Sequence, residues 1–171
     1  MTTPAAEESF REYVRARGGT LGRTAYLLTG DQHLAEDLVQ QTLVQVASRW
    51  ERILAGGDPD AYVRRVLYHQ HVSWWRRHRR EAVPVESLPD GAGPDVFGGV
   101  ALSLTVRLAV AKLAPKQRAV LVLRYFEDLT EVQAAQVLGV SVGTVKSQTR
   151  DALARLRVLA PELAALEEVS R

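Results

Sequence analysis

Residues 129–157 carry a succession of helix start and stop signals that leaves little choice of structure. Thr130, followed three residues later by Gln133, has the spacing of a capping box at the start of a helix. Gly139 stands where that helix should stop, because only glycine enters the left-handed conformation at little steric cost. Ser141 then has the position of an N-cap. The sequence therefore predicts a helix, a three-residue turn and a second helix.

Both predicted helices have one apolar face. In the first helix this face consists of Val132, Ala135 and Leu138, and in the second of Val142, Val145, Thr149, Leu153 and Leu156. The outward positions of the second helix, with Ser141 at its start, carry hydroxyls, an amide and two cations: Thr144, Lys146, Ser147, Gln148 and Arg150. Such side chains contact base edges and phosphates, so this helix-turn-helix predicts binding in a DNA major groove.

The composition is that of an ordinary globular protein, with 46% hydrophobic and 25% charged residues. The sequence has no cysteine, which excludes disulfides and thiolate metal ligands. The N-terminus lacks the basic start and apolar run of a secretory signal, and no stretch reaches the roughly 18 apolar residues of a membrane helix. We therefore expect a cytoplasmic protein without membrane insertion.

Helical periodicity recurs along the chain, whereas the alternation typical of strands is absent. The pattern predicts an all-α fold, with helices over residues 5–17, 21–28, 34–53, 60–80, 100–113 and 117–126 before the helix-turn-helix. Gly18 and Gly19 are expected to interrupt the first helix. Gly30 is expected as a helix stop and Asp31 as the cap of the next helix. Asp58 and Pro59 are expected to cap and open the helix over 60–80.

Residues 82–99 contain three prolines and four glycines without helical periodicity. Such a composition is typical of a flexible linker. The linker divides the chain into residues 1–81 and residues 100–171, the latter including a short C-terminal tail. We therefore expect two small helical bundles joined by a flexible linker.

The helix over 60–80 is strongly basic, with six arginines and no acidic residue after position 60: Arg64, Arg65, Arg76, Arg77, Arg79 and Arg80. Trp74 and Trp75 directly precede the densest part. Guanidinium groups neutralise phosphates, and an indole offers a stacking face to an unpaired base. The combination favours contact with DNA that is being opened over a merely solvated face. At least one of the two indoles is also expected in the core.

His69 and His71 do not indicate a metal site, because residues two apart face different sides of a helix. No acidic ligand lies close to them in sequence. The sequence also lacks a glycine-rich phosphate loop, a nucleophile motif and a paired carboxylate site. We therefore expect neither a metal nor another cofactor, and no enzymatic activity.

The helix over 34–53 has a different exposed face, composed of acidic and amide side chains: Glu36, Asp37, Gln40, Gln41 and Gln45. Carboxylates on this face would repel DNA. Taken alone, the pattern is typical of a solvated helix face, and a protein-binding surface is the alternative.

Two strings occur in a characteristic order: DQHLAEDLVQQT over residues 31–42 and GVSVGTVKS over residues 139–147. Between them lie AYVRRVL at residues 61–67 and WWRR at residues 74–77. With these strings the chain resembles the extracytoplasmic-function (ECF) sigma factors of bacterial RNA polymerase, in particular the actinobacterial SigE-like branch. The resemblance covers about residues 10–159. A helix-turn-helix alone is shared with many regulators, whereas both parts together are specific.

The resemblance implies an alternative sigma factor that recruits core RNA polymerase to a small set of promoters. In that family the first module binds the polymerase clamp and the promoter −10 element, and the second binds the −35 element and the polymerase flap. An anti-sigma factor is a common further partner, which leaves no recognisable mark in this sequence.

The resemblance also implies roles for particular residues. Polymerase docking falls to Glu36, Asp37, Gln40 and Gln41, which replaces the interpretation of a solvated face. The −10 recognition and melting region includes His69, Trp74, Trp75, Arg76 and Arg77. Contacts to the −35 element fall to Arg124, Lys146 and Ser147.

The chain departs from the family pattern at two positions. His69 stands where many relatives have Asn, in a segment that helps to hold a flipped −10 base. Asp151 stands where relatives usually have Arg, and the neighbouring Arg150 is the candidate to take over the basic role. An acidic group there would repel phosphate or accept from a cytosine amino group. Both departures bear on base preference and not on the class of protein.

The predicted linker has adequate reach for a two-part promoter. About 18 residues span at most roughly 60 Å when fully extended. Two DNA elements one and a half turns apart are separated by roughly 50 Å.

Two rival functions remain open on the residues alone. The first is a stand-alone helix-turn-helix regulator that uses only the C-terminal module, usually as a dimer on a palindrome. The second is a protein-binding regulator whose basic helix is simply solvated.

Overall fold

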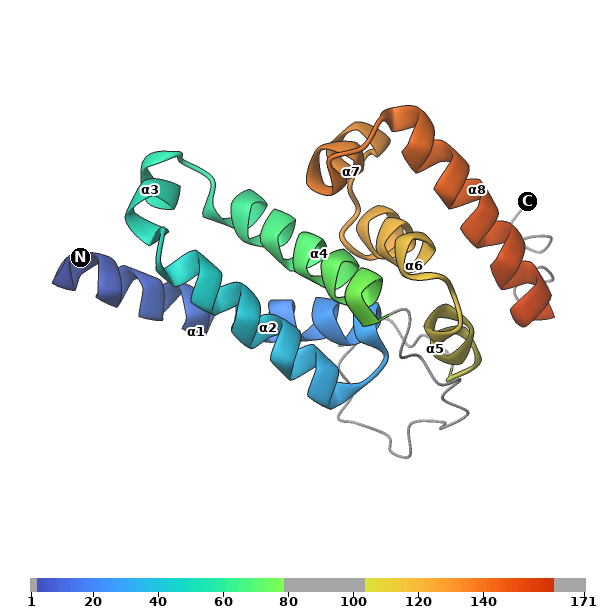
Figure 1. The fold of residues 1–171 in the computed structure, drawn as a ribbon, viewed down its shortest axis with the longest axis horizontal. Coiled ribbons are helices and arrows are strands. Elements are labelled where there is room, and N and C mark those ends of the chain that lie inside the picture. Colours follow the sequence, from blue (N-terminus) through green and yellow to red (C-terminus); the bar gives the residue numbers. More distant parts are fainter. Residues whose placement is uncertain (1–2, 79–103, 162–171) are drawn as a thin grey trace. The chain divides into compact units, whose positions relative to one another are not determined.

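The computed structural model describes residues 3–78 and 104–161 (Figure 1). Every regular element in these ranges is a helix, which confirms the all-α prediction. The chain divides into two compact units, Met1–Ala82 and Val83–Arg171, which are described separately below. The predicted linker, the C-terminal tail beyond Pro161, and the candidate residues Arg79 and Arg80 lie outside the described residues.

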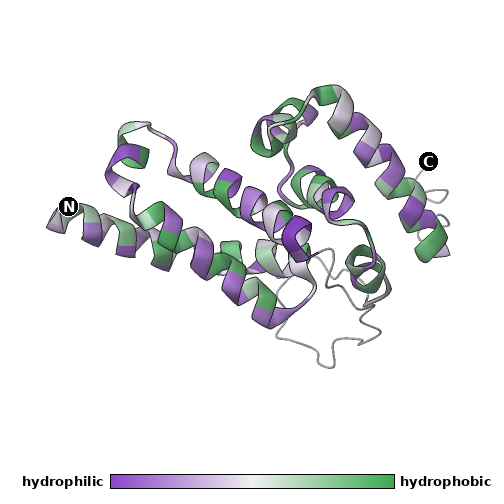
Figure 2. Cartoon of the chain, in the orientation of Figure 1, coloured by the Kyte–Doolittle hydropathy of each residue, from purple (hydrophilic) through white to green (hydrophobic). Residues whose placement is uncertain are grey.

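The first unit consists of α1 (Pro4–Thr29), α2 (Gln32–Ala47), α3 (Trp50–Ala55) and α4 (Pro59–His78). Helix α2 packs against both α1 and α4, and the short α3 contacts all three. The largest fully buried side chains of this unit come from all four helices: Leu28, Val46, Trp50, Leu67, Tyr68 and His71. Apolar and polar residues are interspersed along the helices (Figure 2).

Helix α1 is continuous through Gly18 and Gly19, so the prediction of two helices separated at these glycines is wrong. A glycine inside a helix costs about 1 kcal/mol relative to alanine. Packing offsets this cost, because the residues after the glycines bury Leu21, Ala25 and Leu28 against the rest of the unit. The helix ends where predicted, at Gly30, which adopts a left-handed conformation with φ 71°.

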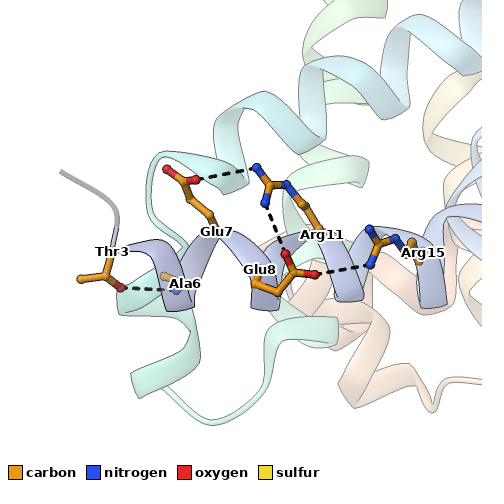
Figure 3. A network of polar contacts seen from close by, with 6 residues as sticks. All are labelled: Thr3, Ala6, Glu7, Glu8, Arg11 and Arg15. Carbon is orange, nitrogen blue, oxygen red and sulfur yellow. Dashed lines mark hydrogen bonds and ion pairs between the residues drawn. The ribbon is translucent and has the colours of Figure 1, made fainter.

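The first turns of α1 carry exposed ion pairs. Glu7 and Glu8 both pair with Arg11, at 3.8 and 3.3 Å, and Glu8 also pairs with Arg15 at 3.5 Å (Figure 3). Exposed pairs of this kind contribute little to stability. Their effect is electrostatic. The two acidic and two basic side chains compensate one another, so they form neither a positive nor a negative patch.

The helix predicted over residues 34–53 is two helices, because the chain turns at Ser48 and Arg49. The turn allows Trp50 to enter the core, where it is 2% exposed. Its indole lies 5.3 Å from the Phe10 ring and 4.9 Å from the Tyr13 ring, between centroids, and its N–H donates to Ser9 at 3.3 Å. Burial of this large aromatic side chain against α1 therefore overrides the continuous helical pattern.

The second unit consists of α5 (Leu104–Ala111), α6 (Pro115–Leu121), the π-helical segment η1 (Val122–Phe126), α7 (Glu131–Leu138) and α8 (Val142–Leu159). Helix α8 packs against α5, α6 and α7. One core cluster includes residues of α5, α6 and α8 and the chain that follows α5 and α8: Ala109, Val110, Leu113, Leu121, Ala152, Leu156 and Ala160.

The α-helix predicted over residues 117–126 changes to π-helical geometry at Val122. The amide of Glu127 donates to the carbonyl oxygen of Val122, five residues earlier, at 3.0 Å. The wider turn accommodates an additional residue. Val122 and Leu123 are buried, whereas Tyr125 and Phe126 are 59% and 37% exposed.

Arg118 of α6 is buried, with 4% exposure. Its guanidinium donates to the carbonyl oxygens of Val110, Ala111 and Leu113, which lie at the end of α5 and just beyond it. Burial lowers the pKa of Arg118 to about 10, so the group stays charged at neutral pH. A cation at a helix C-terminus is also favoured by the helix dipole.

The helix-turn-helix forms at the predicted caps. Thr130 and Gln133 make the reciprocal capping box, Gly139 is left-handed with φ 66°, and Ser141 caps α8 by accepting from the Thr144 amide at 3.1 Å. One prediction for the first of these helices is wrong, because Val132 is 54% exposed. The buried side of α7 is instead formed by Ala134, Ala135 and Val137.

Across residues 3–78 and 104–161, the helices are all too short or too polar to cross a membrane.

Candidate nucleic-acid interface

The outer face of α4 carries basic side chains on successive turns. Arg65 and His69 are exposed in the middle of the helix, and Arg76 and Arg77 are exposed near its end. Arg64 is half-buried. Because the opposite face of α4 lies in the core, the exposed cations project from a helix whose orientation is fixed.

His71 lies on the other face of α4 from His69, as the spacing predicts. The His71 side chain is 1% exposed, whereas His69 is exposed. One ion cannot be bound by two side chains on opposite faces. Among the residues that the structure describes, no group of three His, Cys, Asp or Glu side chains could hold a metal.

Trp74, Trp75 and His78 form an aromatic cluster at the end of α4. The His78 imidazole stacks on Trp74, with ring centroids 4.3 Å apart and planes inclined by 19°. Trp75 meets Trp74 edge-on at 4.9 Å between centroids. Both indoles are half-buried, so the prediction that at least one lies in the core is wrong. Trp74 also lines a small pocket together with Thr29 and Leu34, where α1 ends and α2 begins.

An open cavity of about 250 Å³ lies where α3 passes into α4, and the sequence did not predict it. Its wall consists of two arginines, a tyrosine, one isoleucine of α3 and two residues of the turn: Arg49, Arg52, Tyr62, Ile53, Gly56 and Asp58. The Arg49 guanidinium donates to the Tyr62 hydroxyl at 3.4 Å. The available signal was the three-residue spacing of Arg49 and Arg52, which places both on one side of a helix.

The turn that forms this cavity is fixed by backbone requirements. Gly57 has φ 86°, a conformation that side chains disfavour. Asp58 then accepts from the Ala61 amide at 3.0 Å and caps α4, with Pro59 in the first helical position, as predicted. Tyr62, Arg65 and His69 follow at spacings of three and four, so one stripe of α4 leads from the cavity along the basic face.

The exposed face of α2 is acidic and amide-rich, as predicted. Glu36, Asp37, Gln40 and Gln41 are all exposed, and Asp31 caps the helix by accepting from the Leu34 amide at 2.9 Å. Val44 continues this face by one turn and is 71% exposed. Val44 was not among the residues predicted for this surface.

In α8 the outward side chains are those predicted, with different degrees of exposure. Thr144, Lys146 and Arg150 are exposed, whereas Ser147 and Gln148 are half-buried. The Ser147 hydroxyl donates to the Thr144 carbonyl oxygen at 3.1 Å. Lys146 and Arg150 are therefore the most accessible cations at the start of this helix.

Two of the residues predicted to contact the −35 element, Ser141 and Arg124, form hydrogen bonds within the unit. Ser141 is exposed, and its hydroxyl lies 2.9 Å from that of Thr144 in addition to capping α8. Arg124, in the π-helical segment, is half-buried and donates through Nη1 to the Leu129 carbonyl oxygen. Arg124 therefore braces the turn that leads into α7.

Acidic side chains stand beside both exposed cations in the first half of α8, Lys146 and Arg150. Lys146 Nζ lies 3.8 Å from a carboxylate oxygen of Glu131 on α7, and Arg150 Nε lies 3.6 Å from Asp151. This placement reduces the positive potential that α8 presents to DNA, so the charge distribution of the helix-turn-helix differs from a simple basic patch.

Comparison with known proteins identifies the class that this arrangement defines. Residues 13–81 match Sigma-70 region 2, and residues 103–156 match Sigma-70 region 4. The chain is 43% identical over 148 residues to the RNA polymerase sigma-E factor of Streptomyces avermitilis, covering 86% of this chain and 83% of that protein. It is 31% identical over 151 residues to the ECF RNA polymerase sigma factor SigL of Mycobacterium tuberculosis, covering 84% of each.

A solved structure agrees with these sequence matches. The sigma factor RpoE of Bartonella quintana, in complex with the anti-sigma factor NepR, superposes with a TM-score of 0.71 at 26% identity, covering 89% of this chain and 96% of that chain. The chain belongs to the sigma-70 family of RNA polymerase sigma factors. Within that family it belongs to the ECF group, on the branch of the actinobacterial sigma-E factors. It is a non-enzymatic factor of promoter recognition and transcription initiation. The match to region 2 leaves the stand-alone helix-turn-helix regulator without support.

Proposed function

We propose that the chain directs core RNA polymerase to a small set of promoters by dividing the work between its two modules. Residues 1–81 bind the polymerase and the −10 element, residues 82–99 link the modules, and residues 100–171 bind the −35 element. The observation that carries this proposal is the combination of an arginine-tryptophan helix in one unit with a capped helix-turn-helix in the other.

The −10 surface is the outer face of α4. Exposed arginines neutralise the phosphates of the DNA, and each such contact releases counterions. The half-buried rings of the aromatic cluster formed by Trp74, Trp75 and His78 suit stacking on bases that have lost their partners. Candidates for this surface are Arg64, Arg65, His69, Trp74, Trp75, Arg76, Arg77, Arg79 and Arg80.

The cavity between α3 and α4 receives one unpaired base of the melted strand. Enzymes that act on flipped bases hold them by stacking and by hydrogen bonds to the base edge. Here Arg49 and Arg52 supply donors, and Tyr62 supplies an aromatic ring. The stripe that leads from Tyr62 to His69 connects this cavity with the basic face of α4.

The exposed face of α2 docks on the polymerase clamp. The proposed contacts are Glu36, Asp37, Gln40 and Gln41, with Val44 as an apolar anchor. Carboxylates keep this face away from DNA, and an apolar side chain surrounded by polar groups fits the apolar centre and polar rim of a protein interface. The exposed Tyr125 and Phe126 are the corresponding candidates for the polymerase flap.

The outward side of the helix-turn-helix contacts the −35 element. Lys146 and Arg150 are placed to reach guanine edges or phosphates, and Thr144, Ser147 and Gln148 to donate or accept at bases. Ser141 and Arg124 contribute by holding the turns on either side of α7.

Location and regulation follow from this role. The chain acts in the cytoplasm, where the polymerase works. By similarity to the Bartonella quintana sigma factor, which is bound by an anti-sigma factor, an anti-sigma factor controls its access to the polymerase.

Run-off transcription on fragmented genomic DNA with purified core enzyme tests the proposal. Core enzyme with this chain should initiate at discrete sites, and core enzyme alone should not. A gel shift with and without core enzyme gives a second readout, since the two modules need the polymerase to set their spacing. Tight specific binding by the free chain, with no specific initiation, would overturn the proposal.

A further inference from the structure

The ion pair between Glu131 and Lys146 joins the two helices of the helix-turn-helix. Glu131 is the first residue of α7, and Lys146 lies in the second turn of α8. The ammonium and carboxylate groups are 3.8 Å apart, and the two side chains are 63% and 37% exposed. Glu131 therefore stands beside a cation that the proposed function assigns to the −35 element.

Both ends of this pair have rigid backbones. The Thr130–Gln133 capping box fixes Glu131, with hydrogen bonds of 3.2 and 2.9 Å. The left-handed Gly139 and the Ser141 cap fix the start of α8, and thus the position of Lys146. The side chains are flexible, but the two points from which they extend are held in place.

Stability does not account for the pair, because an exposed ion pair contributes between about 0 and 1 kcal/mol. Electrostatics also opposes a carboxylate at a DNA-binding surface, since phosphates are anions. Lys146 can contact either a phosphate or a base edge, and these two targets differ in charge. A phosphate approaching the ammonium is repelled by Glu131, whereas the O6 and N7 atoms of guanine are neutral acceptors.

We propose that Glu131 is a specificity-determining residue that biases Lys146 away from phosphates and towards base edges of the −35 element. The inference rests on the proposed −35 role of Lys146. Lys146 can bind a phosphate on DNA of any sequence, and there the Glu131 carboxylate repels the phosphate. A contact from Lys146 to a base edge of the correct element involves a neutral acceptor. Glu131 therefore lowers non-specific binding more than it lowers binding to the −35 element.

The test uses holoenzyme assembled from core polymerase and the full chain, with a duplex pool randomised over the promoter length as probe. E131Q should raise retention of unselected duplexes by roughly 2- to 5-fold, the range expected for one exposed charge pair. The −35 sequence that emerges from selection should become less sharply defined. In the K146A background E131Q should have no further effect on either readout. D151N is the matched control, because Asp151 pairs with Arg150 and its effect should persist in K146A.

The outcomes separate the inference from the function on which it rests. If K146A alone leaves −35 selection unchanged, the proposed role of Lys146 is wrong. If K146A weakens selection but E131Q leaves the preference for the −35 element intact, only the inference fails. An E131Q effect of equal size with and without Lys146 would also overturn it, because Glu131 would then act as a general charge.

Discussion

Tyr13 of α1 donates a hydrogen bond to Asp60 in the first turn of α4, at 3.0 Å and 47 positions away in sequence. Arg17, one turn further along α1, donates to the second oxygen of the same carboxylate. These two bonds fasten the middle of α1 to the start of α4. The turn that forms the cavity is thereby held by α1 as well as by its own cap at Asp58.

The Tyr13–Asp60 contact should make the first unit sensitive to alkaline pH. Burial, the hydrogen bond to Asp60 and the charge of that carboxylate raise the pKa of Tyr13 above its ordinary value of about 10. Below that pH the hydroxyl is protonated in the folded and unfolded states, and the contact contributes in full. Above it the unfolded chain loses the proton first, so the free energy of unfolding falls as pH rises.

Urea denaturation followed by tryptophan fluorescence measures this effect, since all three tryptophans lie in the first unit. Y13F should be less stable than the wild type at pH 8 by about 1 kcal/mol, the size of one hydrogen bond. Its stability should also decline less between pH 9 and pH 11. Equal declines in the two proteins would contradict the prediction.

Replacement of Arg118 by Met should destabilise the second unit by roughly 2–4 kcal/mol, because three carbonyl oxygens at the end of α5 lose a buried charged donor. Hydrogen exchange of the amides of α6 and α8 measures the loss. K112M is the control, since Lys112 is an exposed cation in the same turn. Protection in R118M equal to that in K112M would show that the guanidinium is not needed.

Trp74→Ala or Trp75→Ala should slow strand opening at the −10 element by roughly 10-fold, because stacking on one base is worth about 1–3 kcal/mol. Permanganate footprinting of unpaired thymines in the holoenzyme complex follows the opening. Binding to a template with a pre-melted −10 region should be less affected than opening of duplex DNA. Normal opening in both variants would count against the role of the aromatic cluster.

Single substitutions on the exposed face of α2 should weaken binding to core polymerase without altering the fold. Val44→Asp and Asp37→Lys should each reduce affinity by about 10-fold, the effect of a moderate interface residue. Fluorescence anisotropy of the labelled chain titrated with core enzyme measures it. Glu12→Lys makes the same charge change as D37K on an exposed position of α1 and should leave affinity unaltered. If E12K and D37K weaken binding equally, overall charge is responsible.

Arg49→Ala or Arg52→Ala should reduce stable open complexes by roughly 10-fold, since a good contact to a base edge is worth about 1–3 kcal/mol. The loss should depend on the base at one −10 position, which a panel of four single-base promoters would locate. R23A is the matched control, because it removes an exposed arginine of α1 that lies outside the cavity. A loss of the same size on all four promoters would indicate a phosphate contact and not a base pocket.

Local signals in the sequence determined where most helices begin and end. Asp31, Asp58, Thr130 and Ser141 cap helices as predicted, and Gly30 and Gly139 end helices in left-handed conformations. Such signals are readable because a cap involves atoms only two or three residues apart. The order of the two family motifs likewise identified the class of protein from the sequence alone.

Tertiary packing decided the remaining features. Packing keeps α1 continuous through Gly18 and Gly19, and it ends the next helix before Trp50 so that this side chain is buried. It also leaves Val132 exposed. It also brought Arg49 and Arg52 together with Tyr62 around a cavity, and Glu131 next to Lys146. These outcomes depend on contacts between residues far apart in the chain. A local helix preference is worth roughly 1 kcal/mol, and the energy of the tertiary contacts exceeds it.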